Sequence, residues 1–254
     1  MNNLLIAFPE KSEQERVQTA KEFYLNFTDT IVETIKLISQ SEASFLKRNT
    51  ADVSLLQRII EKGKNIQLQP CHQFNVEYYN LLYSKLLPNI NFVFLYMPFT
   101  TKSVDKVFQR IRSRFGSRLI AATEFRNKKS ILEQKQYAIT LGADQNPPVI
   151  EAAYWLSFFK KPTPFLSAPA NAAIKNNLAV VFVNFKKIKR GYYHFENVLL
   201  TENASELTPQ KITISYKNFV QEMIQLQPAN YLWTHKRWKH SFSDAYENNK
   251  IETF

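Results

Sequence analysis

IQLQPCHQFNVEYYNLLYSKLLPNINFVFLY, residues 66–96, carries the signals of a strand, a helix and a second strand in succession. We expect a short strand over residues 66–69, a helix over 75–87 that ends at Pro88, and a buried strand over 91–96. Strands that alternate with helices of ten or more residues indicate β–α–β units, and such units build a parallel sheet. This stretch therefore predicts an α/β fold.

The pattern continues on both sides of this unit. Further helices are expected over residues 11–42, 52–62, 103–115, 128–136, 165–176 and 212–225, and further strands over 118–122, 137–142, 178–185 and 192–200. Residues 144–164 are expected to be irregular, because four prolines interrupt them. The predicted fold class is α/β, with a mixed, mostly parallel sheet flanked by helices and a helical N-terminal portion. We expect one domain over residues 1–254, with a helical portion at 1–63, an α/β core at 64–240 and a polar tail at 241–254.

Composition excludes several classes of protein. The chain has 254 residues with 20 Phe and 12 Tyr, too much apolar surface for an intrinsically disordered protein. Cys71 is the single cysteine, which excludes a disulfide scaffold, and four glycines leave no Gly-rich phosphate loop. No apolar run approaches the ~20 residues that span a bilayer. The N-terminus becomes charged too early for a signal peptide.

The net charge is strongly positive. Lys and Arg number 33 and Asp and Glu 22, which gives +11 at pH 7. Such a charge predicts an anionic partner: nucleic acid, an acidic membrane surface or an acidic protein. Charge alone does not choose among these three. A nucleic-acid-binding protein is the alternative that rests on charge only, since the sequence holds no recognised nucleic-acid motif.

His72 is the strongest candidate for a catalytic base. It follows a predicted strand and precedes a predicted helix, at the edge of an α/β sheet where functional sites gather. Glu77 follows with four residues between them, and a loop-to-helix junction can fold that carboxylate back onto the imidazole. Glu77 would then accept from one ring nitrogen and leave the other free to take a proton. The alternative from the same residues is a histidine that caps a helix.

The segment around His72 resembles a known catalytic block. PCHQFNVEYYN, residues 70–80, is similar to the G-H-aromatic-G-N-W-E block of the lysophospholipid acyltransferase superfamily, and most similar to the late acyltransferases of lipid A biosynthesis. His72, Asn75 and Glu77 match that block in place. The replacements are Cys71 and Phe74 for glycine, Gln73 for the aromatic residue and Val76 for tryptophan.

Other segments resemble the same family in the same order. They are AFPEKSEQER (7–16), RSRFG (112–116), GADQNPP (142–148), WLSFFKKPTPFLSAPANAA (155–173) and PANYLWTHKRWK (228–239). Lys160 stands where the family has glycine, and Asn230 where it has glutamine. The resemblance thus covers residues 7–239 and implies a glycerolipid acyltransferase-like fold.

The resemblance implies an enzyme that moves a fatty acyl chain from a thioester to a lipid hydroxyl. The donor would be acyl carrier protein or acyl-CoA, and the acceptor an anionic membrane lipid such as a lipid A precursor. His72 would be the general base and Glu77 its orienting, charge-stabilising partner, with no covalent enzyme intermediate. The resemblance implies no cofactor, and we expect no metal because three or more ligands at a recognised spacing are lacking.

Substrate-binding roles are also implied for neighbouring residues. Asn75 would support the catalytic loop, and Asp144 would support the site. Arg112 or Arg114 would bind an acceptor phosphate, since a guanidinium suits bidentate phosphate contact. Phe74 would narrow the pocket, line an acyl channel or block the site.

The implied location is the cytoplasmic face of the inner membrane. The family begins with a hydrophobic membrane helix, and this sequence starts about where that helix ends. We therefore expect either peripheral docking on the membrane surface or an anchoring helix that is missing from this sequence. The basic cluster at residues 186–190 is either a solvated turn or a docking site for anionic lipid or carrier protein.

Three further hypotheses belong beside the leading one. A catalytically degenerate lipid- or carrier-binding member of the same fold is suggested by Cys71, Phe74 and Val76. A Cys71–His72 nucleophile is disfavoured, because neighbours in sequence do not normally face each other. His235 and His240 suggest a metal or nucleotide site, which the neighbouring Lys and Arg residues disfavour for a cation.

Overall fold

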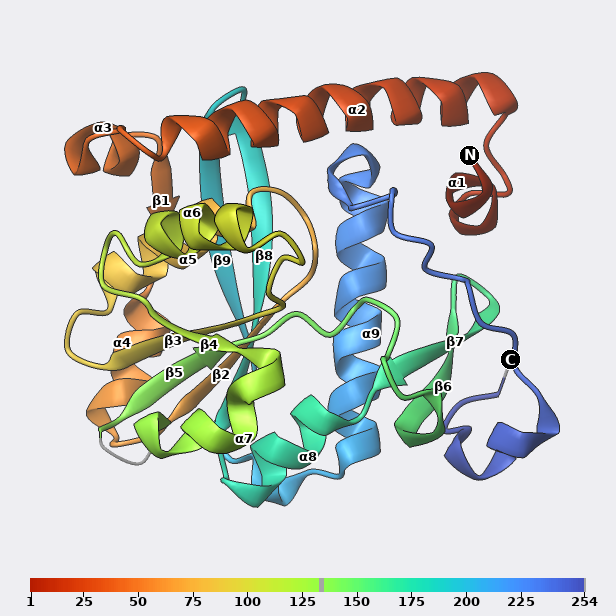
Figure 1. Ribbon diagram of the computed structural model, residues 1–254. Coiled ribbons are helices and arrows are strands. Elements are labelled where there is room, and N and C mark those ends of the chain that lie inside the picture. The colour runs from red at the N-terminus through yellow and green to blue at the C-terminus, as the bar shows by residue number, and fades with distance from the viewer. Residues whose placement is uncertain (133–134, 254) are drawn as a thin grey trace.

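A computed structural model describes residues 1–132 and 135–253 of the chain and has a seven-stranded sheet at its centre (Figure 1). The spatial order is β1-β9-β8-β2-β5-β3-β4, and only the β8–β9 pair is antiparallel. The strands are β1 (Asn49–Ala51), β2 (Ile66–Pro70), β3 (Asn91–Tyr96), β4 (Arg118–Ala121), β5 (Tyr137–Thr140), β8 (Ala179–Lys189) and β9 (Tyr192–Thr201). The predicted α/β class with a mostly parallel sheet is therefore confirmed.

The strand at the centre of the sheet leads into the expected site. β2 pairs with β8 on one side and β5 on the other, and all its residues are buried. The chain then passes through residues 71–75 into α5 (Val76–Leu86), whose N-cap is Asn75. Because β2, β3, β4, β5 and β8 run parallel, their carboxyl ends and the loops that follow share one edge of the sheet.

Helices cover both faces of the sheet (Figure 1). They are α1 (Asn2–Ala7), α2 (Glu13–Lys36), α3 (Glu42–Leu46), α4 (Ser54–Glu61), α5, α6 (Lys102–Arg112), α7 (Phe125–Lys128), α8 (Ala168–Lys175) and α9 (Pro209–Leu226). Short 3-10 helices lie at Ala122–Glu124, Lys129–Leu132, Ile150–Ala152, Ala204–Glu206, Pro228–Asn230 and Asp244–Asn249. One apolar cluster packs α8 and α9 against the sheet, and a second packs α4 and α5 against it.

The N-terminal portion is helical, as predicted, but it is divided differently. The expected helix at 11–42 is α2 followed by the separate α3, because a capping box at Ser12 and Glu15 starts the first and Ser41 caps the second. α2 lies across the ends of β8 and β9 (Figure 1). Among residues 1–132 and 135–253, no helix combines the length and the apolar composition that crossing a bilayer requires.

The prediction of irregular chain over 144–164 is wrong in its second half. Residues 153–166 form an antiparallel hairpin of β6 (Ala153–Phe158) and β7 (Lys161–Leu166). A strand in a two-stranded sheet always has one unpaired edge, so Pro162 and Pro164 need not break the ladder. Phe159 and Lys160 form the two-residue turn with φ of 51° and 57°, the left-handed conformation that tight hairpins use.

One predicted helix is only partly testable. The expected helix at 128–136 corresponds to the end of α7 and the 3-10 helix Lys129–Leu132, while residues 133 and 134 lie outside the described residues. The remaining helix and strand predictions agree with the observed elements apart from their ends.

Candidate active site

His72 lies directly after β2, at the carboxyl edge of the sheet. Its Nδ1 atom is 2.6 Å from Oδ1 of Asp144, and its backbone N–H donates to Oδ2 of the same carboxylate at 3.0 Å. The His72 side chain is 30% exposed, whereas that of Asp144 is fully buried. The arrangement is therefore a solvent-accessible imidazole seated on a buried carboxylate.

Asp144 is fixed by groups from distant parts of the chain. The Tyr216 hydroxyl, from α9, lies 3.3 Å from Oδ1 of Asp144, donates to the Pro70 carbonyl at 2.8 Å and accepts from the Ala143 N–H at 3.1 Å. The Tyr231 hydroxyl donates to the backbone carbonyl of Asp144 at 3.4 Å. These contacts tie the loop after β5 to the end of β2.

The contact between His72 and Asp144 shifts the pKa of both side chains. Burial raises the pKa of Asp144, but the charge and hydrogen bonds of His72 outweigh it and bring the pKa to about 2. Burial lowers the pKa of His72, and the charge and hydrogen bond of Asp144 raise it to a net value above the ordinary 6.5. An ionised Asp144 accepts the proton of Nδ1, so a neutral His72 presents the lone pair of Nε2.

Gly142 brings the backbone of the β5 loop against the imidazole. A Cβ atom on this residue would lie 2.8 Å from Cε1 and 3.2 Å from Nδ1 of His72. Both distances are shorter than ordinary van der Waals contact. The ring position therefore depends on glycine at this site.

Glu77 has a different partner from the one that the spacing suggested. Its two oxygens accept from Nε and Nη2 of Arg112 at 2.7–3.0 Å, and both side chains are about nine-tenths buried. The Arg112 guanidinium also lies over the rings of Tyr96 and Phe108, at 5.0 and 5.3 Å from their centroids. The structure thus brings together His72 with Asp144 and Glu77 with Arg112.

The other candidates have structural contacts. Asn75 caps α5 by accepting from the Tyr78 N–H at 3.3 Å, and its Nδ2 donates to Glu33 of α2 at 3.0 Å. Phe74 is buried in the apolar cluster that holds α5. Arg114 donates to the backbone carbonyls of Leu37 and Gln40, just after the end of α2.

Cys71 lacks the setting of a nucleophile. Its thiol is buried, and burial together with the charge of Asp144 raises its pKa well above the ordinary value. The thiolate is the reactive form of cysteine, so this environment disfavours nucleophilic chemistry. Among the described residues, no group of three or more His, Cys, Asp or Glu side chains is placed to hold a metal ion.

The C-terminal segment pairs with the loop that bears His72. The Leu232 N–H donates to the His72 carbonyl at 3.0 Å, and Tyr231 forms a β-bridge with Gln73. Arg237, fully buried, donates to the Pro164 carbonyl at 2.8 Å. Sequence analysis did not identify Gly142, Tyr216 or Tyr231. The available signal was the position of GADQ at the end of a predicted strand.

The sequence model of the bacterial lipid A biosynthesis acyltransferase family matches residues 1–240. The chain matches no curated protein in sequence. A match over almost the whole chain covers all the elements that meet at His72 and Asp144. The protein belongs to the bacterial lipid A biosynthesis acyltransferase family.

Proposed function

We propose that the protein transfers a fatty acyl chain from a thioester to a hydroxyl group of a membrane lipid, with His72 as the general base. The observation that carries this proposal is the 2.6 Å contact between Nδ1 of His72 and the buried Asp144, with the imidazole accessible to solvent. A base needs a partner for one nitrogen and an open path to the other. The Nδ1 contact and the partial exposure of the His72 side chain support this role.

In the proposed reaction, Nε2 of His72 takes the proton of the acceptor hydroxyl as its oxygen attacks the thioester carbonyl. Asp144 holds the imidazole in the Nδ1–H tautomer and stabilises the imidazolium that forms. Collapse of the tetrahedral intermediate breaks the carbon–sulfur bond, and the imidazolium returns the proton to the departing thiolate. The products are an ester and a free thiol, and no covalent enzyme intermediate is required.

We assign the orienting role to Asp144, and Glu77 becomes a positioning residue. Glu77 sits in the first turn of α5, two residues after the catalytic loop ends at Asn75, and its bonds to Arg112 fasten that turn to α6. Binding of an acceptor phosphate by Arg112 or Arg114 stays a prediction, because their observed contacts are to Glu77 and to backbone carbonyls. The predicted substrate roles of Asn75 and Phe74 likewise stay predictions.

The family suggests the substrates and the location. It implies an acyl donor and a lipid A precursor as acceptor, and it is associated with the inner membrane. We propose acyl carrier protein or acyl-CoA as donor and the cytoplasmic face of the membrane as the site of reaction. The net charge of +11 supports both choices, since the carrier protein is acidic and the acceptor is anionic.

Mass spectrometry of the reaction products tests the proposal. Purified protein is mixed with acyl–acyl carrier protein and either a lipid A precursor or a lysophospholipid, and each acceptor is examined for a gain of one acyl chain. His72→Ala should abolish the gain, and His194→Ala, a histidine on β9 that contacts Thr50, should keep it. Full activity in folded His72→Ala protein would overturn the mechanism.

A degenerate binding member of the same fold is the second candidate. It is favoured by Phe74, a bulky buried side chain where the resembling family has glycine. In that case the wild-type protein binds lipid without turnover, and Phe74→Gly does not restore transfer. A gain of one acyl chain by any acceptor with wild-type protein rejects this candidate.

A further inference from the structure

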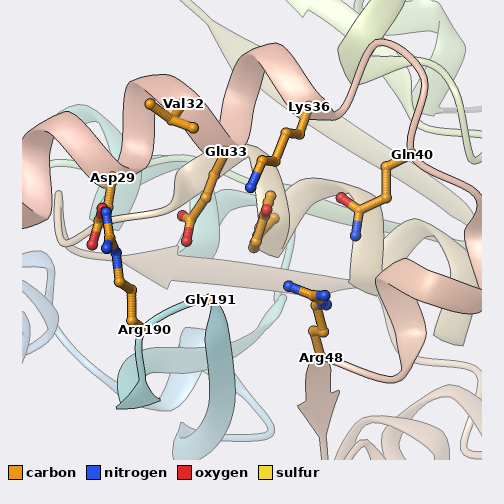
Figure 2. A pocket seen from close by; sticks show the side chains of 9 residues that line it. Asp29, Val32, Glu33, Lys36, Gln40, Arg48, Arg190 and Gly191 are labelled. Carbon is orange, nitrogen blue, oxygen red and sulfur yellow. The ribbon is translucent and has the colours of Figure 1, made fainter.

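A polar cavity lies near the catalytic loop, between α2 and the β8–β9 hairpin (Figure 2). Its volume is about 350 Å³, and its wall includes Glu33, Lys36, Arg48 and Arg190. Asn75 connects it to the loop that bears His72, through the hydrogen bond to Glu33. The cavity is thus a neighbour of the proposed acyl-transfer site, with a different set of side chains.

The two carboxylates of the cavity already have partners. Asp29 accepts from Nε and Nη2 of Arg190 at 2.9 and 2.7 Å and lies 3.4 Å from Nζ of Lys187. Glu33 accepts from Asn75 and from the Tyr193 hydroxyl, which is 2.9 Å away. Neither carboxylate needs a cationic ligand to satisfy its oxygens.

Two cations of the cavity lack such compensation. Within the part of the chain that the structure describes, no carboxylate lies within ion-pair distance of Lys36 or Arg48. Arg48 rests over the ring of Tyr192 at 5.5 Å. The side chains of Lys36 and Arg48 extend into the space between α2 and the hairpin (Figure 2). A guanidinium and an ammonium that converge on one cavity are suited to the oxygens of a phosphate group.

The helix above the cavity has an apolar outward face. Its exposed members are Tyr24, Leu25, Ile31, Val32 and Ile35, between 44% and 68% exposed. At 3.6 residues per turn they fall within about 120° of the circumference of α2, opposite the buried Phe23 and Thr34. Asp29 and Glu33, the acidic residues of this half of the helix, contact the hairpin and the catalytic loop, so neither carboxylate lies on the outward face.

This face and the cavity adjoin each other. Val32 belongs to the exposed apolar face and also lines the cavity, and Lys36 follows one turn later. A mainly apolar helix face without carboxylates, beside basic side chains, is the pattern of a helix that lies in the headgroup region of an anionic membrane. The apolar face fits the acyl boundary, and the cations fit the phosphates.

We propose that this cavity binds the phosphate group of an anionic membrane lipid through Lys36 and Arg48 while the outward face of α2 lies in the bilayer interface. The inference rests on the cavity and on α2, and it holds whether or not His72 catalyses acyl transfer.

Vesicle co-sedimentation tests the proposal without any activity readout. The full chain is mixed with phosphatidylcholine vesicles that contain or lack phosphatidylglycerol. Wild-type protein should prefer the anionic vesicles, and Lys36→Gln/Arg48→Gln should weaken that binding by roughly 30-fold, as expected for two basic side chains at an anionic surface. Lys175→Gln/Lys211→Gln, an equal charge change on α8 and α9 away from α2, should stay within about threefold of wild type.

Two further measurements distinguish a membrane lipid from a soluble phosphate as the ligand of the cavity. Ile31→Ser/Ile35→Ser should weaken binding to anionic vesicles while leaving the affinity for inorganic phosphate, measured by calorimetry, unchanged. Circular dichroism and the melting temperature confirm that each variant is folded. Equal binding of neutral and anionic vesicles would overturn the proposal, as would wild-type vesicle binding by Lys36→Gln/Arg48→Gln. Phosphate binding with no vesicle preference would instead assign the cavity to a soluble phosphate.

Discussion

The imidazole of His72 is held from two sides, by the carboxylate of Asp144 at Nδ1 and by the backbone of Gly142 at Cε1. Replacing Asp144 with Asn keeps the size of the side chain but removes the charge that fixes the tautomer and stabilises the imidazolium. We expect Asp144→Asn to lower the rate of acyl transfer by about 10²- to 10⁴-fold. The measurement is the initial rate with an acyl–acyl carrier protein donor.

Glu77→Gln is the matched control for Asp144→Asn, because it converts the other candidate carboxylate partner of His72 to an amide in the same way. Its rate, measured at a temperature where it is folded, should fall far less than that of Asp144→Asn. A large loss in Glu77→Gln beside near-normal transfer in Asp144→Asn would return the orienting role to Glu77.

Gly142 gives a steric prediction at the same scale. Gly142→Ala places a methyl group 2.8 Å from Cε1 of His72, so the ring must shift away from Asp144. Productive geometry tolerates small displacements only, and we expect a loss of at least about tenfold in kcat. Gly63→Ala is the control, because no heavy atom lies within 4 Å of the added Cβ and its backbone strain should lower stability alone. Unchanged kcat in Gly142→Ala would show that the ring is not positioned by this contact.

His72 could be predicted from its place after a strand at the carboxyl edge of the sheet, and Asp144 from the resemblance of residues 142–148 to the family. Their pairing could not be predicted. The interval between His72 and Glu77 spans a loop and the start of a helix, so the spacing does not fix where either side chain points. Asp144 is 72 positions away, and only the β2–β5 pairing brings the two loops together.

At the scale of elements, the Glu77–Arg112 ion pair joins α5 to α6. Removing the charge of Glu77 leaves a buried guanidinium without its partner, which costs about 3–5 kcal/mol in other proteins. We expect Glu77→Gln to lower the free energy of unfolding, measured by urea titration, by an amount in this range.

The exposed pair of Glu42 with Lys85 provides the control for that measurement. Both of its side chains are over 40% exposed, so Glu42→Gln should change the free energy of unfolding by less than about 1 kcal/mol. Equal effects of the two substitutions would mean that the Glu77–Arg112 pair does not stabilise the packing of α5 on α6.

Periodicity and helix-capping signals predicted most elements, because local residues determine them. The β2–α5–β3 unit agrees with the expected ranges to within one residue at each end. The β6–β7 hairpin departs from the prediction, because proline usually interrupts a strand but is tolerated in this two-stranded sheet. The short β1 was missed too, since its three residues carry no pattern of their own and pair with the distant β9.

At the scale of the whole molecule, the residues after the matched family region pack back onto the core. Tyr246 stacks on the buried Trp155 at 5.2 Å, and Glu252 pairs with Lys217 of α9 at 3.1 Å. A chain that ends at His240 loses these contacts. We expect its melting temperature to fall by roughly 5–10 °C, in line with a loss of a few kcal/mol in a domain of this size.

Acyl transfer should survive this truncation below the new melting temperature, because Tyr231 and Leu232 still pair with the His72 loop. Calorimetry and the acyl-transfer assay check the two halves of the prediction. An unchanged melting temperature, or a folded truncated protein without activity, would contradict it.

The collinear blocks anticipated this convergence only in outline. Resemblance over residues 7–239 indicated a single acyltransferase-like domain that includes the N-terminal, central and C-terminal segments. It did not indicate which atoms meet. Contacts such as Asn75 with Glu33 and Leu232 with His72 join segments 42 and 160 positions apart, and their geometry depends on the packing of the whole chain.

The pH dependence of kcat/KM for acyl transfer tests whether His72 acts as a base held by Asp144, since a base works only in its neutral form. Asp144 raises the pKa of His72, so activity should increase as pH rises through a value above 6.5. His235, the nearby histidine of the C-terminal segment, has a pKa lowered by burial and by Arg237, so it does not produce this limb. Asp144→Asn should move the limb to lower pH, and Glu77→Gln should leave it in place. A profile that is flat from pH 5 to 8, or one that Asp144→Asn does not move, would rule out His72 as a base whose pKa is raised by Asp144.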